Sequence, residues 1–174
     1  MSVEELRLEA KNKHLAGDSE AAILLLTKAI QIKNSAEIAL DMVQILTDSG
    51  QLSQAQDLFN RLPDSAKTSE MGKSLTAQLT FKNLASKTSG LEELKVLNFT
   101  EISNYQVKFD LALCYFAEHQ INSGMELLFQ IQEHKSDFQN GAAKEMIVMI
   151  CNMLSSSKPK LGNNYRQRLS ELLN

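Results

Sequence analysis

The 174-residue sequence has few of the residues that break or cross-link a chain: seven glycines, two prolines and two cysteines. No Gly/Ser-rich or proline-rich stretch interrupts it, which argues against a flexible linker between domains. With 43% hydrophobic residues, a chain of this length buries a substantial core. We therefore expect one compact domain or a short array of repeats.

The sequence also lacks an excess of basic charge and long apolar runs. The formal net charge is −3, which argues against a protein that binds nucleic acid mainly through phosphate contacts. No apolar run reaches the roughly 18 residues that a membrane span requires. The acidic stretch Met1–Lys11 lacks the apolar core of a secretion signal. We expect a cytoplasmic protein that binds neither nucleic acid nor membranes.

The residue types that carry catalysis are scattered along the chain. None of the three histidines, His14, His119 and His134, has a metal-ligand companion three or four residues away on the same expected helix. Cys114 and Cys151 form no C-x-x-C pair, and isolated cysteines on helical patterns are most often buried and reduced. No glycine-rich phosphate loop is present. The sequence therefore predicts that the protein is not an enzyme and holds no metal or other cofactor.

One pattern recurs along the chain: a turn glycine, a small residue five positions on, a large apolar residue four beyond that, and a further apolar residue. The first two copies, 33 positions apart, are Gly17, Ala22, Leu26, Ala29 and Gly50, Ala55, Phe59, Leu62. A weaker third copy has His119 at the turn, followed by Gly124, Leu128 and Ile131. The glycine permits a tight turn between antiparallel helices, and the small residue lets them approach closely. A period near 34 residues with this pattern resembles the tetratricopeptide repeat (TPR).

Apolar spacing and capping residues predict an all-α, TPR-like helical-repeat solenoid of about nine to ten helices with a diverged middle repeat. Expected helices include 2–15, 18–33, 35–47, 51–62, 64–86, 91–97, 104–118, 141–154 and 163–173, with connectors at 98–103 and 155–159. We expect a single domain, 1–174. It divides into repeat 1 (1–34), repeat 2 (35–63), a diverged insertion or repeat (64–102), repeat 3 (103–135) and a C-terminal helix pair (136–174).

In a TPR array the first helix of each pair lines a concave face. On this mapping the candidate groove residues are Arg7, Lys11, Leu40, Gln44, Phe109, Leu113 and Phe116. Arg7 and Lys11 suit a clamp for a carboxylate, whereas Asp110 would repel one. The groove therefore changes from charged to apolar. Its apolar end either binds an unfolded segment or is covered by the helix of the 64–102 region.

Two blocks near the C-terminus are more specific than the repeats. The first, Asp137–Lys144, reads DFQNGAAK, and the second contains Tyr165, Arg166, Arg168 and Leu169. With the GDSEAA and GQLSQA turns, they resemble the C-terminal region of the YbbN-type thioredoxin-like co-chaperones, or chaperedoxins, over essentially the whole chain. The thioredoxin-like domain that begins those proteins has no counterpart here, so we expect either a fragment or a stand-alone version.

The resemblance implies a module that binds unfolding client proteins and passes them to chaperonin or DnaK-type machinery. It also implies a candidate docking site on the last helix, formed by Tyr165, Arg166, Arg168, Leu169, Leu172 and Leu173. Alternatively, this helix only covers the apolar face of the last repeat. Two further functions stay open: a scaffold for one fixed protein partner, and a redox protein that uses its thiols, which would need a low thiol pKa. The oligomeric state stays open as well.

Overall fold

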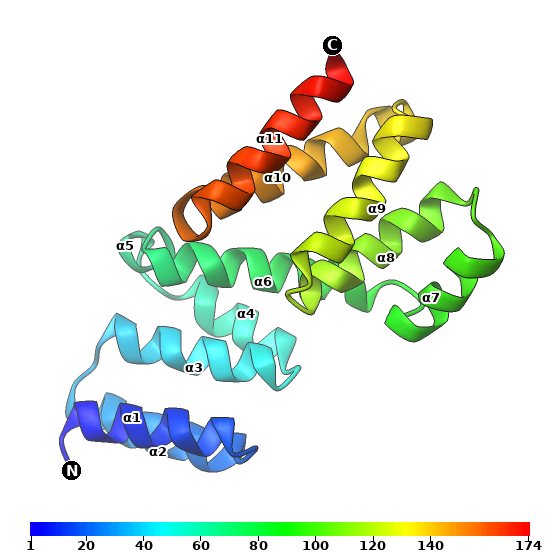
Figure 1. Cartoon of the computed structure of the whole chain (residues 1–174). Helices are drawn as coiled ribbons and strands as arrows, with labels where there is room; N and C mark the ends of the chain where they lie inside the picture. The colour runs from blue at the N-terminus through cyan, green and yellow to red at the C-terminus, as the bar shows by residue number, and fades with distance from the viewer. The chain divides into compact units, whose positions relative to one another are not determined.

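The computed structural model describes residues 1–174, which form helices joined by short turns (Figure 1). The all-α helical-repeat fold that the sequence predicts is confirmed. The helices are α1 (Val3–Leu15), α2 (Ser19–Ile32), α3 (Ala36–Asp48), α4 (Leu52–Asn60), α5 (Asp64–Lys67), α6 (Glu70–Ser86), α7 (Leu91–Thr100), α8 (Tyr105–Ala117), α9 (Ile121–His134), the short 3₁₀ helix η1 (Phe138–Asn140), α10 (Ala142–Ser157) and α11 (Pro159–Leu173).

The chain forms two compact units, Met1–Thr80 and Phe81–Asn174. Each unit is built from helices that pack against their neighbours in sequence, as in a repeat array. The expected single domain and the repeat boundaries at 34, 63, 102 and 135 stay predictions.

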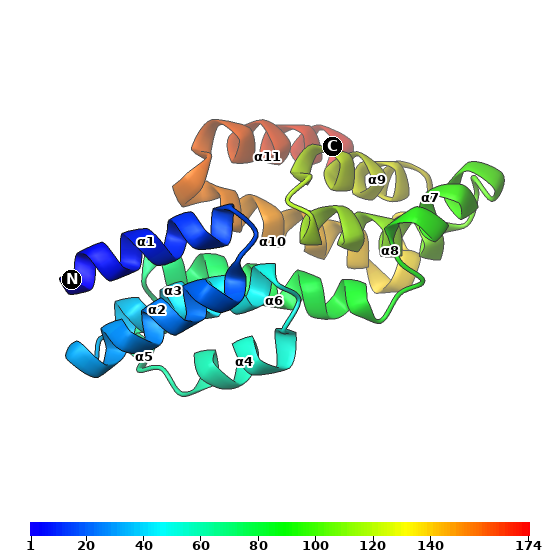
Figure 2. The same ribbon diagram turned by 90° about the horizontal axis from the view of Figure 1, so that it is seen from below.

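In the first unit, α1 packs against α2, α2 against α3 and α3 against α4 (Figure 2). Helix α3 contributes to two apolar cores. Its Ile38 and Ile45 pack with α1 and α2, whereas Leu40, Val43 and Leu46 pack with α4, α5 and α6. A helix that is apolar on two faces needs neighbours on both sides. Helix α3 therefore belongs to both apolar cores of the first unit.

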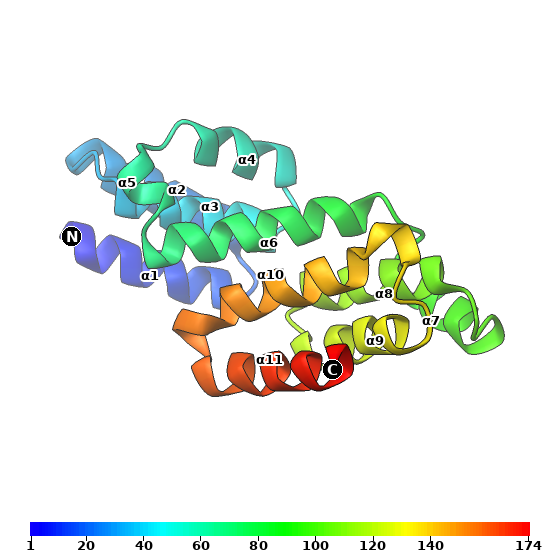
Figure 3. The same cartoon turned by 90° about the horizontal axis from the view of Figure 1, so that it is seen from above.

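In the second unit, consecutive helices from α7 to α11 pack in sequence order (Figure 3). Helix α9 supplies the centre of this unit, because Met125, Leu128, Phe129 and Ile131 are fully buried. Helix α10 adds further buried side chains from one face, so α9 is covered on two sides.

The three predicted repeat turns share one backbone conformation. Gly17 and Gly50 have φ values of 90° and 76°, and His119 has a φ of 60°. In each turn the next residue donates its N–H to a carbonyl five residues back; for Gln120 the acceptor is Tyr115 at 2.8 Å. This is the Schellman C-terminal motif, which places its C′ residue in the left-handed region. The third repeat therefore keeps the turn even though a non-glycine residue occupies it.

The small residues of the pattern lie where paired helices approach most closely. Ala22 and Ala55 are completely buried. At the equivalent position, a Cβ added to Gly124 would lie 2.5 Å from the ring of Phe116. Phe116 packs in turn against Phe81, with ring centroids 5.2 Å apart. The glycine thus makes space for a phenylalanine that the other two repeats lack.

The expected continuous helix 64–86 is wrong, because it is divided into α5 and α6. Ser69 accepts a hydrogen bond from the N–H of Gly72 at 3.1 Å, as an N-cap residue does. Gly72 lies so close to α5 that an added Cβ would be 2.1 Å from the carbonyl oxygen of Ala66. The serine cap and this close contact start a new helix at Glu70.

Two other expected boundaries are also wrong. Helix α7 extends through Thr100 rather than ending at Leu97, and the expected loop 155–159 is reduced to Lys158. The expectation treated Pro159 as part of the loop, but it is the first residue of α11. Proline is favoured at that position, because the N–H that it lacks has no partner within the helix.

We predict that Gly124→Ala lowers the free energy of unfolding by about 1–2 kcal/mol, because the new methyl group clashes with Phe116. This outcome opposes the intrinsic preference of helices for alanine over glycine, about 1 kcal/mol. Urea denaturation followed by circular dichroism measures the change. In a Phe116→Leu background the same substitution should cost less, and a Gly124→Ala protein as stable as the parent would contradict the prediction.

We predict that His119→Gly raises the free energy of unfolding by about 0.5–1 kcal/mol. Left-handed backbone costs a non-glycine residue about 1–2 kcal/mol, and the greater entropy of an unfolded glycine offsets part of the gain. The neighbouring Glu118→Gly, at a φ of −96°, is the control and should destabilise. Thermal denaturation of both variants tests the sign, and a loss of stability in His119→Gly would refute the argument.

Candidate functional site

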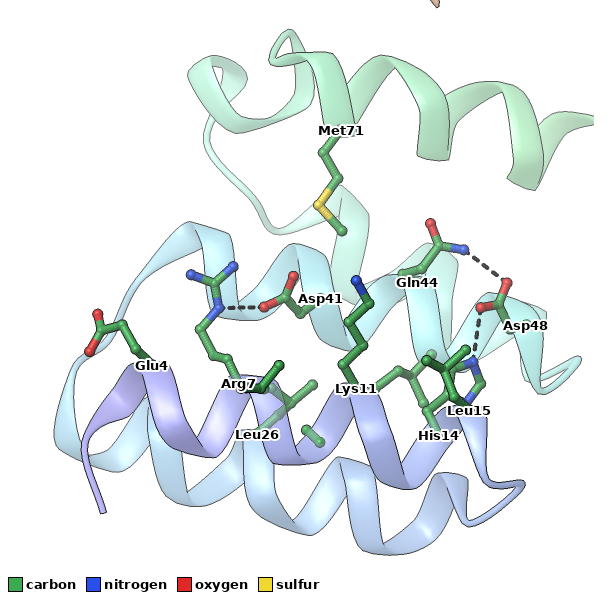
Figure 4. Close-up of a pocket in the computed structure, with 13 residues that line it drawn as sticks. Glu4, Arg7, Lys11, His14, Leu15, Leu26, Asp41, Gln44, Asp48 and Met71 are labelled. Carbon is green, nitrogen blue, oxygen red and sulfur yellow. Dashed lines mark hydrogen bonds and ion pairs between the residues drawn. The ribbon is translucent and has the colours of Figure 1, made fainter.

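A groove in the first unit is lined mainly by α1, α3 and the start of α6, with Leu26 of α2 (Figure 4). Its volume is about 510 Å³, within the range of about 300–1,000 Å³ typical of ligand sites. The lining combines charged, amide and apolar side chains: Glu4, Arg7, Leu8, Ala10, Lys11, His14, Leu15, Leu26, Asp41, Gln44, Ile45, Asp48 and Met71.

Arg7 joins α1 to α3 at one end of this groove. Its Nε donates to Asp41 Oδ2 at 2.6 Å, and its Nη1 donates to Glu37 Oε2 at 3.2 Å. The hydrogen bond to Asp41 raises the pKa of Arg7 above its ordinary value. Because two carboxylates already neutralise this guanidinium, Arg7 is a poor clamp for a carboxylate of a partner.

His14 makes a second link between the same helices. Its Nε2 is 2.9 Å from Asp48 Oδ2, and its Nδ1 is 2.9 Å from Ser19 Oγ. Gln44 continues the polar network, because its Nε2 donates to Asp48 Oδ1 at 2.8 Å and to Gln78 Oε1 at 2.8 Å. The pairs Arg7–Asp41, His14–Asp48 and Gln44–Gln78 each join residues 34 positions apart. We call these three pairs the 34-residue ladder; it fixes the register of α1, α3 and α6.

The structure places three of the predicted groove residues on the groove of the first unit. Arg7, Lys11 and Gln44 line the groove. Leu40 is buried in the core, and Asp41 takes the place predicted for it. The turns recur at a spacing of 33 residues, whereas neighbouring groove helices are in contact at a spacing of 34. A 34-residue offset from Arg7 and His14 would have located Asp41 and Asp48.

The predicted apolar end of the groove is covered within the second unit. Leu113 and Phe116 are 5% and 3% exposed, and Phe116 packs against Phe81. Phe109 is half-buried and packs on Phe138, with ring centroids 5.7 Å apart. Of the two alternatives for this end, the structure favours burial beneath the 64–102 region, which contributes Phe81.

Most of the predicted docking residues of α11 attach it to neighbouring helices. Tyr165 and Leu169 are buried. The hydroxyl of Tyr165 donates to Asn122, and its ring stacks on Phe129 with centroids 6.0 Å apart. Arg166 Nη2 donates to Asn152 Oδ1 at 2.9 Å. These contacts explain why the chain has an aromatic and basic block here: it covers the apolar face of α9 and α10.

Arg168 joins α11 to α9 through two hydrogen bonds to one carboxylate. It donates to both carboxylate oxygens of Glu126, with Nη2 3.1 Å from Oε2, and its guanidinium lies 4.1 Å from the centre of the Phe129 ring. The paired arginine lowers the pKa of Glu126. Of the six residues predicted on this helix, Leu172 and Leu173 are the apolar side chains left exposed, at 39% and 50%.

The cysteines, the possible metal ligands and the helix lengths bear on the other functions considered. Cys114 and Cys151 are buried and unpaired. Burial raises the pKa of Cys151, the opposite of what a nucleophilic thiol requires. Acidic, histidine and cysteine side chains nowhere gather in the groups of three that a metal ion needs. No helix combines the length and apolar character of a bilayer span.

Comparison with known families matches both parts of the chain. A model described as "Tetratricopeptide repeat" matches residues 84–174, just over half of the chain. A second model with the same description matches residues 14–79. Neither is described as a thioredoxin-like co-chaperone. None of the curated proteins compared with the sequence matches it.

Among solved structures, the chain is similar to a domain of unknown function from Vibrio parahaemolyticus. The two are 21% identical, with a TM-score of 0.44, and the similarity covers 98% of this chain and 99% of that one. It is also similar to MamA from Desulfovibrio magneticus, beginning at residue 41, with 16% identity, a TM-score of 0.44, and coverage of 98% and 94%.

We predict that Glu126→Gln lowers the free energy of unfolding at pH 7 by about 0.5 kcal/mol, a value reduced for solvent screening of an exposed pair. Because Arg168 holds the pKa of Glu126 below 4.5, the carboxylate stabilises the folded state fully above pH 4.5. That contribution is lost as the pH falls through the lower pKa of the folded state. The difference between variant and parent should therefore shrink as the pH falls below 4.5.

Urea denaturation across this pH range tests the prediction. Glu9→Gln is the matched control, because Glu9 forms no ion pair and its variant should be as stable as the parent at pH 7. A Glu126→Gln effect of constant size from pH 7 to about pH 3 would contradict the role of the ion pair.

Proposed function

Because this chain belongs to the tetratricopeptide repeat family, we propose that it is a protein–protein interaction module whose principal binding surface is the groove of α1, α3 and α6. The observation that carries the proposal is the groove itself, about 510 Å³ in volume and lined by both apolar and charged side chains. TPR folds are in general protein-binding scaffolds rather than catalysts, in keeping with the scattered histidines and buried thiols of this chain.

The proposal extends to a co-chaperone that binds unfolding client proteins and chaperone machinery, either chaperonin or DnaK-type, in the cytoplasm. Its support is the resemblance of Asp137–Lys144 and of the block that begins at Tyr165 to chaperedoxins. In the first block, Gln139, Asn140 and Gly141 all have positive φ values, so its unusual sequence encodes a left-handed turn before α10. The second block attaches α11.

Because part of α11 is used to attach the helix, fewer of its side chains are available to dock a chaperone. Tyr165, Arg168 and Leu169 hold α11 in place, so a chaperone would contact the remaining exposed side chains. Leu172 and Leu173 supply the apolar part of that surface. Docking and covering the last repeat are then compatible functions of one helix.

A scaffold for one fixed partner is the second candidate function. The 34-residue ladder favours it, because side chains already hydrogen-bonded to one another give the groove a fixed shape. Promiscuous binding surfaces are usually more adaptable. A scaffold would form one tight complex and would not protect unrelated clients from aggregation.

We predict that the intact chain binds purified chaperonin and that Leu172→Ser together with Leu173→Ser weakens this binding about tenfold, because two half-exposed leucines no longer bury apolar area. Biolayer interferometry measures the affinity, and circular dichroism checks that the variant stays helical. The control is Ser170→Ala, an exposed change on the same helix. No binding by the intact chain would reject chaperonin as its chaperone partner; unchanged binding by the double variant would reject this docking surface.

A further inference from the structure

Helix α1 presents an unusual stripe of side chains to the groove. Glu4, Leu8, Lys11 and Leu15 follow at spacings of four, three and four residues, which places them along one face of the helix. All four line the groove, and Figure 4 labels Glu4, Lys11 and Leu15 on this side of α1. Leu8 and Leu15 are 61% and 74% exposed. We call these four residues the α1 stripe.

The charges of the α1 stripe have no partner within the chain. Glu4 and Lys11 form no ion pair, although Arg7 and His14 on the same helix are paired with Asp41 and Asp48 of α3. The internal contacts of the groove are therefore made by one set of α1 residues. The α1 stripe, in which charged residues and leucines alternate, makes none of these internal ion pairs and can contact another molecule.

The spacing of the α1 stripe fits a helix better than an extended strand. Glu4 and Lys11, and likewise Leu8 and Leu15, are seven residues apart, about 10.5 Å along the helix axis. In a strand, three residues span about 10 Å, but residues three apart point to opposite faces. In a helix, residues seven apart return to the same face. An α-helical partner matches both pairs with one continuous side, which a β-strand does not.

We propose that the α1 stripe docks an amphipathic helix of a partner polypeptide. Apolar residues of that helix pack on Leu8 and Leu15, an acidic residue faces Lys11, and a basic residue faces Glu4. Burial of the leucines supplies the affinity, and the opposite charges set the direction and register of the bound helix. This inference rests on the proposed function, since it specifies the partner of the same groove.

Two synthetic helical peptides of identical composition test the proposal. Both carry leucines seven residues apart; one has a lysine seven positions before a glutamate on the same face, and in the other these two residues are exchanged. Fluorescence anisotropy gives the affinity of each for the protein. We expect the parent protein to prefer one peptide by about three- to tenfold, as two exposed ion pairs allow.

The variant Glu4→Lys with Lys11→Glu should reverse this preference while keeping the net charge. The matched control, Glu9→Lys with Lys13→Glu, exchanges the same residue types away from the groove and should leave the preference unchanged. Leu8→Ser should weaken both peptides. Equal affinity for the two peptides, no binding of either, or an unreversed preference in the exchanged variant would each overturn the proposal.

The peptide and chaperonin experiments separate the two proposals. Chaperonin binding without a peptide preference would overturn the helical partner of the α1 stripe alone. A reversible peptide preference without chaperonin binding would support the α1 stripe and overturn chaperonin docking alone.

Discussion

The close approach of two antiparallel helices within each repeat is the constraint on which the rest of the structure depends. Ala22 and Ala55 allow it in the first unit, and Gly124 allows it in the second. Once two helices lie this close, the next helix must cover the large apolar residues that face away from the pair. The order of packing along the chain follows from that requirement. The groove and the α11 contacts are built on this framework.

Much of this framework could be predicted from the sequence, because it depends on short-range features. The turns at Gly17 and Gly50 require a residue that tolerates positive φ, and the small and large positions recur at a fixed spacing. The turn at His119 could be placed only by analogy with the other two, since histidine by itself does not indicate a left-handed residue. The boundary between α5 and α6 at Ser69 could not be predicted in this way. It depends on a serine cap, and serine and threonine also occur inside helices.

The groove and the docking helix were harder to predict, because they depend on which side chains satisfy one another. Arg7 and Lys11 have similar chemistry and lie one turn apart, but the first is neutralised by Asp41 while the second is free. Similarly, Tyr165 and Leu173 belong to one helix, but only the first is buried. Sequence patterns identify a polar face or an apolar stripe. They do not show which of its members are already paired across a distance of 34 or 42 residues.

The 34-residue ladder has a consequence for how this chain tolerates changes in length. Surface loops commonly accept insertions and deletions, and the short connection between α2 and α3 looks like one of them. However, Arg7 with Asp41 and His14 with Asp48 both depend on the number of residues between α1 and α3. Removing a single residue there would displace α3 relative to α1 and disturb both contacts at once. The number of residues in the loop between α2 and α3 must therefore be preserved.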